Sequence, residues 1–144
     1  MFSVRPFEVT DILPLLKEEI NSHLSAWAES GHAETLKRET MAFTGLFNGE
    51  IVGCFGVAEI WKGRGYLWTV FSEKIKEHPV AIHRGFKNFF QTLPFNRIEM
   101  DCPYGLEIAA RRARWMGFEV MCAKAERYLA NDGDATTYHW VRKA

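Results

Sequence analysis

Apolar and polar residues follow two periods along this chain, one typical of strands and one typical of helices. Period-two alternation and β-prone runs predict strands over residues 2–5, 41–47, 50–61, 66–72, 97–102, 118–128 and 135–141. Helical spacing of apolar residues predicts helices over 10–20, 22–39, 79–93 and 105–116. The expected order of elements is therefore β-α-α-β-β-β-α-β-α-β-β.

Turn-forming residues separate the central strands. Asn48-Gly49 predicts a tight hairpin turn in which both residues have a positive φ. Gly53 and Gly56 lie inside the returning strand, where a bulge or a close backbone approach would explain them. The three central strands are thus expected to form an antiparallel meander.

Cap and break residues delimit the helices. Thr10-Asp11 is predicted to cap the first helix, and Ser30-Gly31 is predicted to break the second helical region. Pro79 suits the first position of its helix, so a short linker is expected between that helix and the preceding strand.

The order of elements and the length of the chain together define a fold class. A three-strand meander followed by β-α-β-α-β predicts a mixed α/β sheet with helices on both faces. The 144 residues suffice for one domain, expected over residues 1–144.

Composition narrows the classes of partner. The chain is 47% hydrophobic and 14% aromatic, which argues against disorder. Its formal net charge of zero predicts neither a nucleic-acid nor a membrane partner, and it favours self-association as a homodimer. No signal peptide and no apolar run long enough to cross a membrane is found, so a cytoplasmic location is expected.

Cysteine and histidine spacing does not indicate a metal centre. The three cysteines are Cys54, Cys102 and Cys122, and they lack C-x-x-C spacing. Each lies in an apolar run, so all three are expected to be buried thiols. The histidines show no H-E-x-x-H spacing, and no metal is expected.

Residues 97–120, RIEMDCPYGLEIAARRARWMGFEV, form a predicted strand–helix–strand unit whose helix ends at Gly117-Phe118. With the order of elements along nearly the whole chain, this ending resembles the GCN5-related N-acetyltransferase (GNAT) family, and more particularly its small members encoded by bacteriophages and prophages. The resemblance implies the GNAT fold, acetyl-CoA as cofactor, and transfer of an acetyl group to an amine.

Two family motifs are altered here. The family's Arg/Gln-x-x-Gly-x-Gly/Ala loop holds the pyrophosphate with backbone N–H groups, whereas residues 73–80 read EKIKEHPV, without glycine. The family's C-terminal Asn and Tyr positions correspond to Leu106 and Ala113. The usual general acid is therefore missing from its place, and Tyr104 or Tyr128 is considered as a substitute.

The resemblance also implies where the cofactor would lie. The backbone of the strand around Thr69, Val70 and Phe71 would polarise the thioester carbonyl. Side-chain cations of the linker can replace a glycine loop in part, and a solvated basic face is the alternative. The candidate cofactor-binding residues are Thr69, Val70, Phe71, Ser72, Lys74, Lys76 and His78. For Ser72, a helix cap is the alternative role.

Three carboxylates are candidate bases. Glu99 and Asp101 lie two apart on one strand and so share a face, where burial would raise the pKa and improve a general base. Glu59 on the third strand is a further candidate. The alternative for Glu99 and Asp101 is an exposed polar face opposite the apolar residues of the strand.

Two functions follow from these observations. The first is a divergent GNAT-like N-acetyltransferase that uses acetyl-CoA and an amine that the sequence does not identify. The second is a non-catalytic GNAT-fold binding or structural protein that has lost acetyl-CoA binding, with a phage structural partner and a virion location if the chain is phage-encoded.

Overall fold

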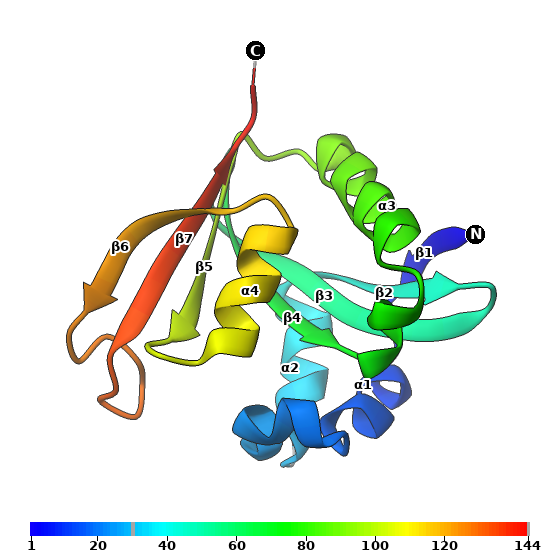
Figure 1. Cartoon of the computed structure of the whole chain (residues 1–144), viewed down its shortest axis with the longest axis horizontal. Coiled ribbons are helices and arrows are strands. Elements are labelled where there is room, and N and C mark those ends of the chain that lie inside the picture. The colour runs from blue at the N-terminus through cyan, green and yellow to red at the C-terminus, as the bar shows by residue number, and fades with distance from the viewer. Residues whose placement is uncertain (30, 144) are drawn as a thin grey trace. The chain divides into compact units, whose positions relative to one another are not determined.

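A computed structural model describes residues 1–29 and 31–143, apart from the side chain of Ser25. Figure 1 shows its elements, which are β1 (Phe2–Pro6), α1 (Val9–Leu16), the 3-10 helix η1 (Glu19–Ala28), α2 (His32–Glu39), β2 (Met41–Phe47), β3 (Glu50–Trp61), β4 (Arg64–Phe71), the 3-10 helix η2 (Glu73–Glu77), α3 (Pro79–Thr92), β5 (Arg97–Pro103), α4 (Glu107–Trp115), β6 (Glu119–Ala125) and β7 (Ala135–Val141). The strands of the described residues form one seven-stranded mixed sheet in the order β1-β2-β3-β4-β5-β7-β6. The predicted mixed α/β fold class is confirmed.

Most predicted bounds agree with the structure within three residues. The bounds of β2, β3 and β7 are as predicted, and α3 begins at Pro79. The strand β4 begins at Arg64, earlier than predicted, because Gly63 has a φ of 91° and closes the turn in two residues. The predicted helical break falls at Gly31, with a φ of 88°, while Ser30 lies outside the described residues.

The predicted cap of the first helix was wrong in position, although Asp11 takes part in the cap that forms. Glu8 is the N-cap, and its backbone N–H donates to Asp11 Oδ2 at 3.0 Å. Asp11 also accepts from Arg5 Nη1 and from Thr44 Oγ1, each at 2.7 Å. The buried Asp11 carboxylate thus completes a capping box as the third helical residue, and it also joins the helix to β1 and β2.

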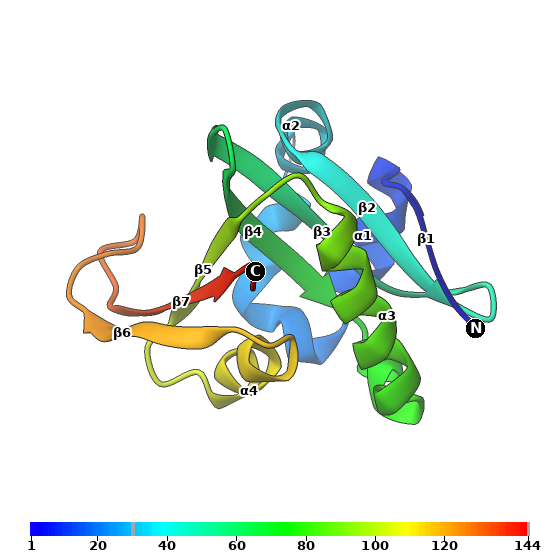
Figure 2. The ribbon, with the colours of Figure 1, turned by 90° about the horizontal axis from the view of Figure 1, so that it is seen from above.

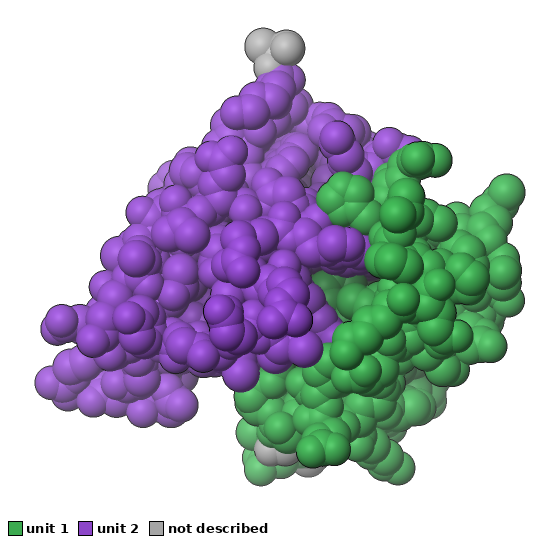
Figure 3. All heavy atoms as spheres, in the orientation of Figure 1, with its two compact units in different colours: residues 1–58, 67–85 green, residues 59–66, 86–144 purple. Residues whose placement is uncertain are grey.

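The chain divides into two compact units, shown in green and purple in Figure 3. Unit 1 contains residues 1–58 and 67–85, and unit 2 contains residues 59–66 and 86–144. The strand β4 and the helix α3 each contribute residues to both units. The expected single domain over 1–144 stays a prediction.

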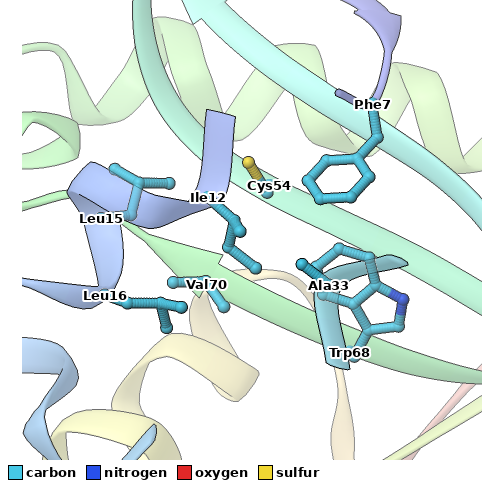
Figure 4. Close-up of a cluster of buried hydrophobic side chains, with 8 residues drawn as sticks. All are labelled: Phe7, Ile12, Leu15, Leu16, Ala33, Cys54, Trp68 and Val70. Carbon is cyan, nitrogen blue, oxygen red and sulfur yellow. The ribbon is translucent and has the colours of Figure 1, made fainter. Parts of the chain in front are cut away.

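In unit 1, β1, β2 and β3 form an antiparallel meander. The predicted turn is confirmed, since Asn48 has a φ of 51° and Gly49 a φ of 83°. Figure 2 shows these three strands side by side. Figure 4 shows the core on one face, where Phe7, which lies just before α1, and buried side chains of α1 and α2 meet those of β3 and β4: Ile12, Leu15, Leu16, Ala33, Cys54, Trp68 and Val70.

The glycines of β3 are explained by close approach. A Cβ on Gly56 would lie 2.5 Å from Trp68 Nε1 and 2.9 Å from Thr40 Oγ1. A Cβ on Gly53 would lie 2.7 Å from the Phe71 ring. A register shift beside Gly53 gives the strand the predicted bulge, while the groups closest to both glycines are side chains.

In unit 2, β5 pairs with β7 and β7 with β6, all antiparallel, while the start of β4 runs parallel to β5. Aromatic side chains of α3 pack on α4 and on Phe118, which follows the turn at the end of α4. The Phe86 and Trp115 rings lie 6.1 Å apart, as do the Phe90 and Phe118 rings. Gly117, with a φ of 94°, lets the Phe118 N–H donate back to the Ala113 carbonyl, which ends α4.

The cysteines depart from expectation at one position. Cys54 and Cys102 are buried, but Cys122 is exposed. Its strand β6 is at the edge of the sheet, and nearly all its side chains are exposed.

The described residues include neither a helix suited to cross a membrane nor a group of side chains suited to hold a metal ion. No described helix is both long and apolar enough to cross a membrane. No group of three or more His, Cys, Asp or Glu side chains within the described ranges is arranged to hold a metal ion.

Candidate functional site

The strand end predicted to polarise a thioester lies in unit 1. Val70 and Phe71 are buried at the end of β4, and Thr69 is half-buried. The Phe71 carbonyl accepts from Asn21 Nδ2 at 2.8 Å, and the same amide donates to the Leu15 carbonyl at 2.9 Å. Asn21 is buried, so this pair of bonds ties the strand end to the helices.

Ser72 acts as a helix cap. Its hydroxyl accepts from the Lys74 N–H at 3.1 Å and donates to Glu18 Oε1 at 3.3 Å. Glu18 also accepts from the Glu73 N–H at 2.9 Å. The hydroxyl is therefore engaged in starting η2, and its role toward a cofactor stays a prediction.

The candidate cations of residues 73–78 lie at the surface with partners. Lys74 Nζ is 2.8 Å from Glu50 Oε2, and Lys76 Nζ is 3.1 Å from Glu73 Oε2. The His78 ring stacks on the Phe47 ring with the centroids 4.2 Å apart. Exposed ion pairs of this kind contribute about 0–1 kcal/mol, so an incoming anion can displace either carboxylate.

The helix α3 follows directly. It has 14 residues, and its first residue, Pro79, has no N–H. The next N–H groups of the first turn, on Val80 and Ala81, lack partners within the helix by their position. Together with the helix dipole they attract an anion at this end.

The candidate base Glu99 lies in unit 2, in a double ion pair. It accepts from Arg64 Nε at 2.7 Å, from Arg64 Nη2 at 2.8 Å and from Arg97 Nε at 2.6 Å. The bonds from Arg64 and then from Arg97 lower its pKa to about 2 although Glu99 is buried. The expected rise in pKa is reversed at Glu99, which makes its carboxylate a weak base.

Asp101, two residues along the same strand, has a different environment. Its carboxylate is half-buried and accepts a hydrogen bond from the Tyr66 hydroxyl. Burial raises the pKa of Asp101, against the lowering effect of that hydrogen bond, and the charge of Glu99 raises it further. Burial and the same carboxylate raise the pKa of Tyr66, so its hydroxyl stays protonated. Glu99 is buried and Asp101 half-buried, so the alternative of an exposed polar face was wrong.

The strand register extends this face across the sheet. Tyr66 lies opposite Glu99, Glu99 opposite His139, and Asp101 opposite Thr137. Within the described part of the chain, Thr137 Oγ1 and His139 Nδ1 are buried atoms without a hydrogen-bond partner. These residues and the two arginines define what we call the Asp101 face: Arg64, Tyr66, Arg97, Glu99, Asp101, Thr137 and His139.

Exposed apolar and aromatic side chains belong to the same region of unit 2. Trp61 is 61% exposed, and Arg64 Cζ lies 4.5 Å from its ring centre. Tyr128 is 53% exposed, and the charge of Asp101 is the main cause of its raised pKa. Met121 is exposed, and its Sδ accepts from Arg97 Nη2 at 2.9 Å.

The remaining candidates divide between the two faces of unit 2. Glu59 is exposed near the end of β3, and the two-residue turn after Trp61 sets it opposite Tyr66. Tyr104 borders a cavity of about 340 Å³ between α4 and the strands β5, β6 and β7, on the face of β5 that carries Cys102. The charge of Asp101 raises the pKa of Tyr128, the other tyrosine considered as the acid.

The structure also explains the altered family positions. Leu106 is the N-cap of α4 and makes no side-chain cap bond. Ala113 lies within α4, and its side chain is fully buried. Neither position can supply the polar group found in the family.

Sequence reasoning named Glu99 and Asp101 but did not find their partners. Arg64 and Tyr66 lie two residues apart on one strand, and Arg97 and Glu99 lie two residues apart on the neighbouring strand. That spacing places each pair on one face and is the signal that was available. The pairing of β4 with β5 was needed to bring the two pairs together.

No family model matches the chain, and no curated protein matches it in sequence. Solved structures do match its fold. Ard1 from Thermoplasma volcanium has a TM-score of 0.73 at 15% identity, covering 99% of each chain. A GNAT-family acetyltransferase from Bacillus anthracis has a TM-score of 0.70 at 15% identity, covering 97% of this chain and 94% of its own. The aminoglycoside acetyltransferase AAC(6')-Ib, solved with coenzyme A, has a TM-score of 0.71 at 14% identity, covering 99% of this chain and 95% of its own. The chain therefore has the GNAT acetyltransferase fold.

Proposed function

We propose that this chain is an N-acetyltransferase that moves an acetyl group from acetyl-CoA to a primary amine. The observation that carries the proposal is the carboxylate of Asp101, which lies half-buried on β5 beside Tyr66 with a raised pKa. The GNAT fold, shared with acetyltransferases over nearly the whole chain, supports the reaction class.

Asp101 is the base that removes a proton from the acceptor nitrogen. A general base works best when its pKa approaches the working pH, and burial moves Asp101 in that direction. Tyr66 holds one carboxylate oxygen by its hydrogen bond, which leaves the other oxygen to face the amine. Glu99 is not assigned this role, because the two arginines hold its pKa low.

The residues of unit 1 suit a pyrophosphate at the start of α3. The N–H groups of Val80 and Ala81 and the helix dipole would bind its oxygens, and Lys74 and Lys76 would exchange their exposed carboxylate partners for it. The backbone of Thr69–Phe71 would hold the thioester end. Acetyl-CoA, when bound, supplies the activated acetyl group.

Binding of acetyl-CoA is the direct test. Calorimetric titration of the full chain, together with its melting temperature, measures that binding. Linkage predicts roughly 2.7 kcal/mol of stabilisation at a hundredfold excess of acetyl-CoA over its Kd. An unchanged melting temperature at millimolar acetyl-CoA, with no heat of binding, would reject the enzyme proposal.

A second candidate function is a GNAT-fold binding or structural protein that does not bind acetyl-CoA. It is favoured by the absence of glycine from residues 73–80 and by the carboxylate partners of both linker lysines. A phage structural role belongs to this candidate. The same titration separates the two functions, because only the first requires a heat of binding.

A further inference from the structure

The charges of the Asp101 face leave room for one cation. Arg64 and Arg97 share Glu99, which accepts from both guanidinium groups. The partner of Asp101 is the neutral hydroxyl of Tyr66. A cation beside Asp101 therefore meets a carboxylate that no arginine neutralises in the described structure, whereas a second cation would meet two guanidinium groups. The further carboxylate opposite Tyr66, Glu59, is exposed, so a second cation there would gain little, because exposed ion pairs are weak.

The two buried polar atoms on β7 are the independent sign of a ligand. Thr137 is 3% exposed, lies directly opposite Asp101, and its Oγ1 has no hydrogen-bond partner among the described residues. His139, two residues along the strand and on the same face, has a buried Nδ1 in the same condition. Buried polar groups without partners are rare in folded proteins because each costs desolvation energy.

The acceptors on this face match the donors of a primary ammonium. An ammonium has three N–H donors and no acceptor. A carboxylate oxygen of Asp101, Thr137 Oγ1 and His139 Nδ1 can each accept one hydrogen bond. Directly opposed side chains on neighbouring strands lie about 5 Å apart at Cβ, which allows one nitrogen to contact both Asp101 and Thr137.

The exposed groups of this region indicate what the ammonium is attached to. Trp61, Met121 and Tyr128 are all more than 40% exposed. Trp61 and Met121 contact the arginines of the Asp101 face, and the charge of Asp101 raises the pKa of Tyr128. Aromatic and thioether side chains bind apolar and aromatic groups, and aromatic rings also attract a cation.

We infer that the acceptor is a monoamine, with a single primary ammonium on an aromatic or apolar body, and not a polycation such as a polyamine or an aminoglycoside. The inference rests on the proposed function for its chemistry, but the binding site itself lies wholly within unit 2. The ammonium binds to Asp101 and Thr137, and the body of the amine lies against the exposed aromatic side chains.

The test is calorimetric titration of the full chain with 2-phenylethylamine and with spermidine, each without acetyl-CoA. We expect 2-phenylethylamine to bind at least tenfold more tightly than spermidine, because its one charge matches Asp101 alone. Equal or tighter binding of spermidine would overturn the inference, and so would the absence of binding by 2-phenylethylamine. The titration with acetyl-CoA is separate, so the failure of one proposal is distinguishable from the failure of the other.

Variants locate the binding. Asp101→Asn should weaken 2-phenylethylamine binding by more than tenfold, and Thr137→Val, which keeps the shape of the side chain, should weaken it by about five- to tenfold. Glu107→Gln, which removes the same charge from α4, should leave the affinity unchanged. Equal effects of Asp101→Asn and Glu107→Gln, at unchanged melting temperatures, would overturn the assignment to the Asp101 face.

Discussion

Charged side chains are exposed in residues 72–79 of unit 1 but buried or half-buried in the Asp101 face of unit 2. In the first region, Lys74 and Lys76 lie at the surface in exposed ion pairs. In the second, Glu99 is buried between two arginines, and Asp101 is half-buried beside a neutral tyrosine. Exposed pairs are weak and exchangeable, whereas buried charges are strongly coupled to their partners. Side chains therefore determine the charge of the Asp101 face, while the binding of an anion at residues 72–79 would depend on the backbone of α3.

The largest expected effect is on catalysis. Asp101→Asn keeps the shape of the side chain and removes the base, so kcat/KM for acetyl transfer to 2-phenylethylamine should fall by about 10²- to 10³-fold. Initial rates of thiol release measure this change. Glu107→Gln serves as the charge-matched control and should keep the rate of the unmodified chain. A loss smaller than threefold would show that Asp101 is not the base.

The next effect is on stability. Glu99→Gln leaves the guanidinium groups of Arg64 and Arg97 without their shared carboxylate, and we expect unfolding free energy to fall by about 3 kcal/mol. Chemical denaturation measures it. Asp101→Asn should cost less than about 1 kcal/mol, because the charged form of Asp101 is already disfavoured by burial. Equal costs for the two variants would contradict the difference between these neighbouring carboxylates.

The pH dependence of stability sharpens the same contrast. The pKa of Glu99 is about 2 in the folded chain and 4.5 as its ordinary value. Its contribution is therefore present above pH 4.5 and is lost as the pH falls from 4.5 toward 2, by about 2–3 kcal/mol. The difference in unfolding free energy between the unmodified chain and Glu99→Gln should shrink across this window. A constant difference from pH 6 to pH 3 would mean that Glu99 does not titrate as the ion pairs require.

The contribution of Asp101 to the unfolding free energy changes with pH in the opposite direction to that of Glu99. A carboxyl group whose pKa is raised on folding favours the folded state most when it is protonated, so this contribution is lost as the pH rises through the folded-state pKa. The pH profile of Asp101→Asn relative to the unmodified chain separates this contribution from that of Glu99.

The smallest effect is expected in residues 72–79. Lys74→Glu with Lys76→Glu should weaken acetyl-CoA binding by about three- to tenfold, because the N–H groups of α3 remain. Unfolding free energy should change by less than about 1 kcal/mol, since both pairs are exposed. Calorimetry and denaturation measure the two quantities, with Lys124→Glu in unit 2 as the control. Unchanged affinity would remove the lysines from the cofactor site.

Local signals made most of the fold predictable. Alternation and helical spacing gave the bounds of β2, β3 and β7 and the start of α3, because each depends on a local pattern or on proline geometry. The turn at Asn48-Gly49 was predictable for the same reason. The cap of α1 was predictable only in part: Asp11 contributes from the third helical position, and its remaining bonds go to Arg5 and Thr44 on β1 and β2.

The candidate site was predictable only in part. The amino-acid order alone determined that Glu99 and Asp101 share a face, that residues 73–80 lack glycine, and that Gly117 ends a helix, since these follow from strand period, composition and backbone freedom. Only the tertiary structure decided which carboxylate is held by arginines and which by Tyr66. The pairing of β4 with β5 and of β5 with β7 brings together residues 32 to 44 positions apart in the chain. The protonation of two carboxylates on one strand face depends on those distant neighbours.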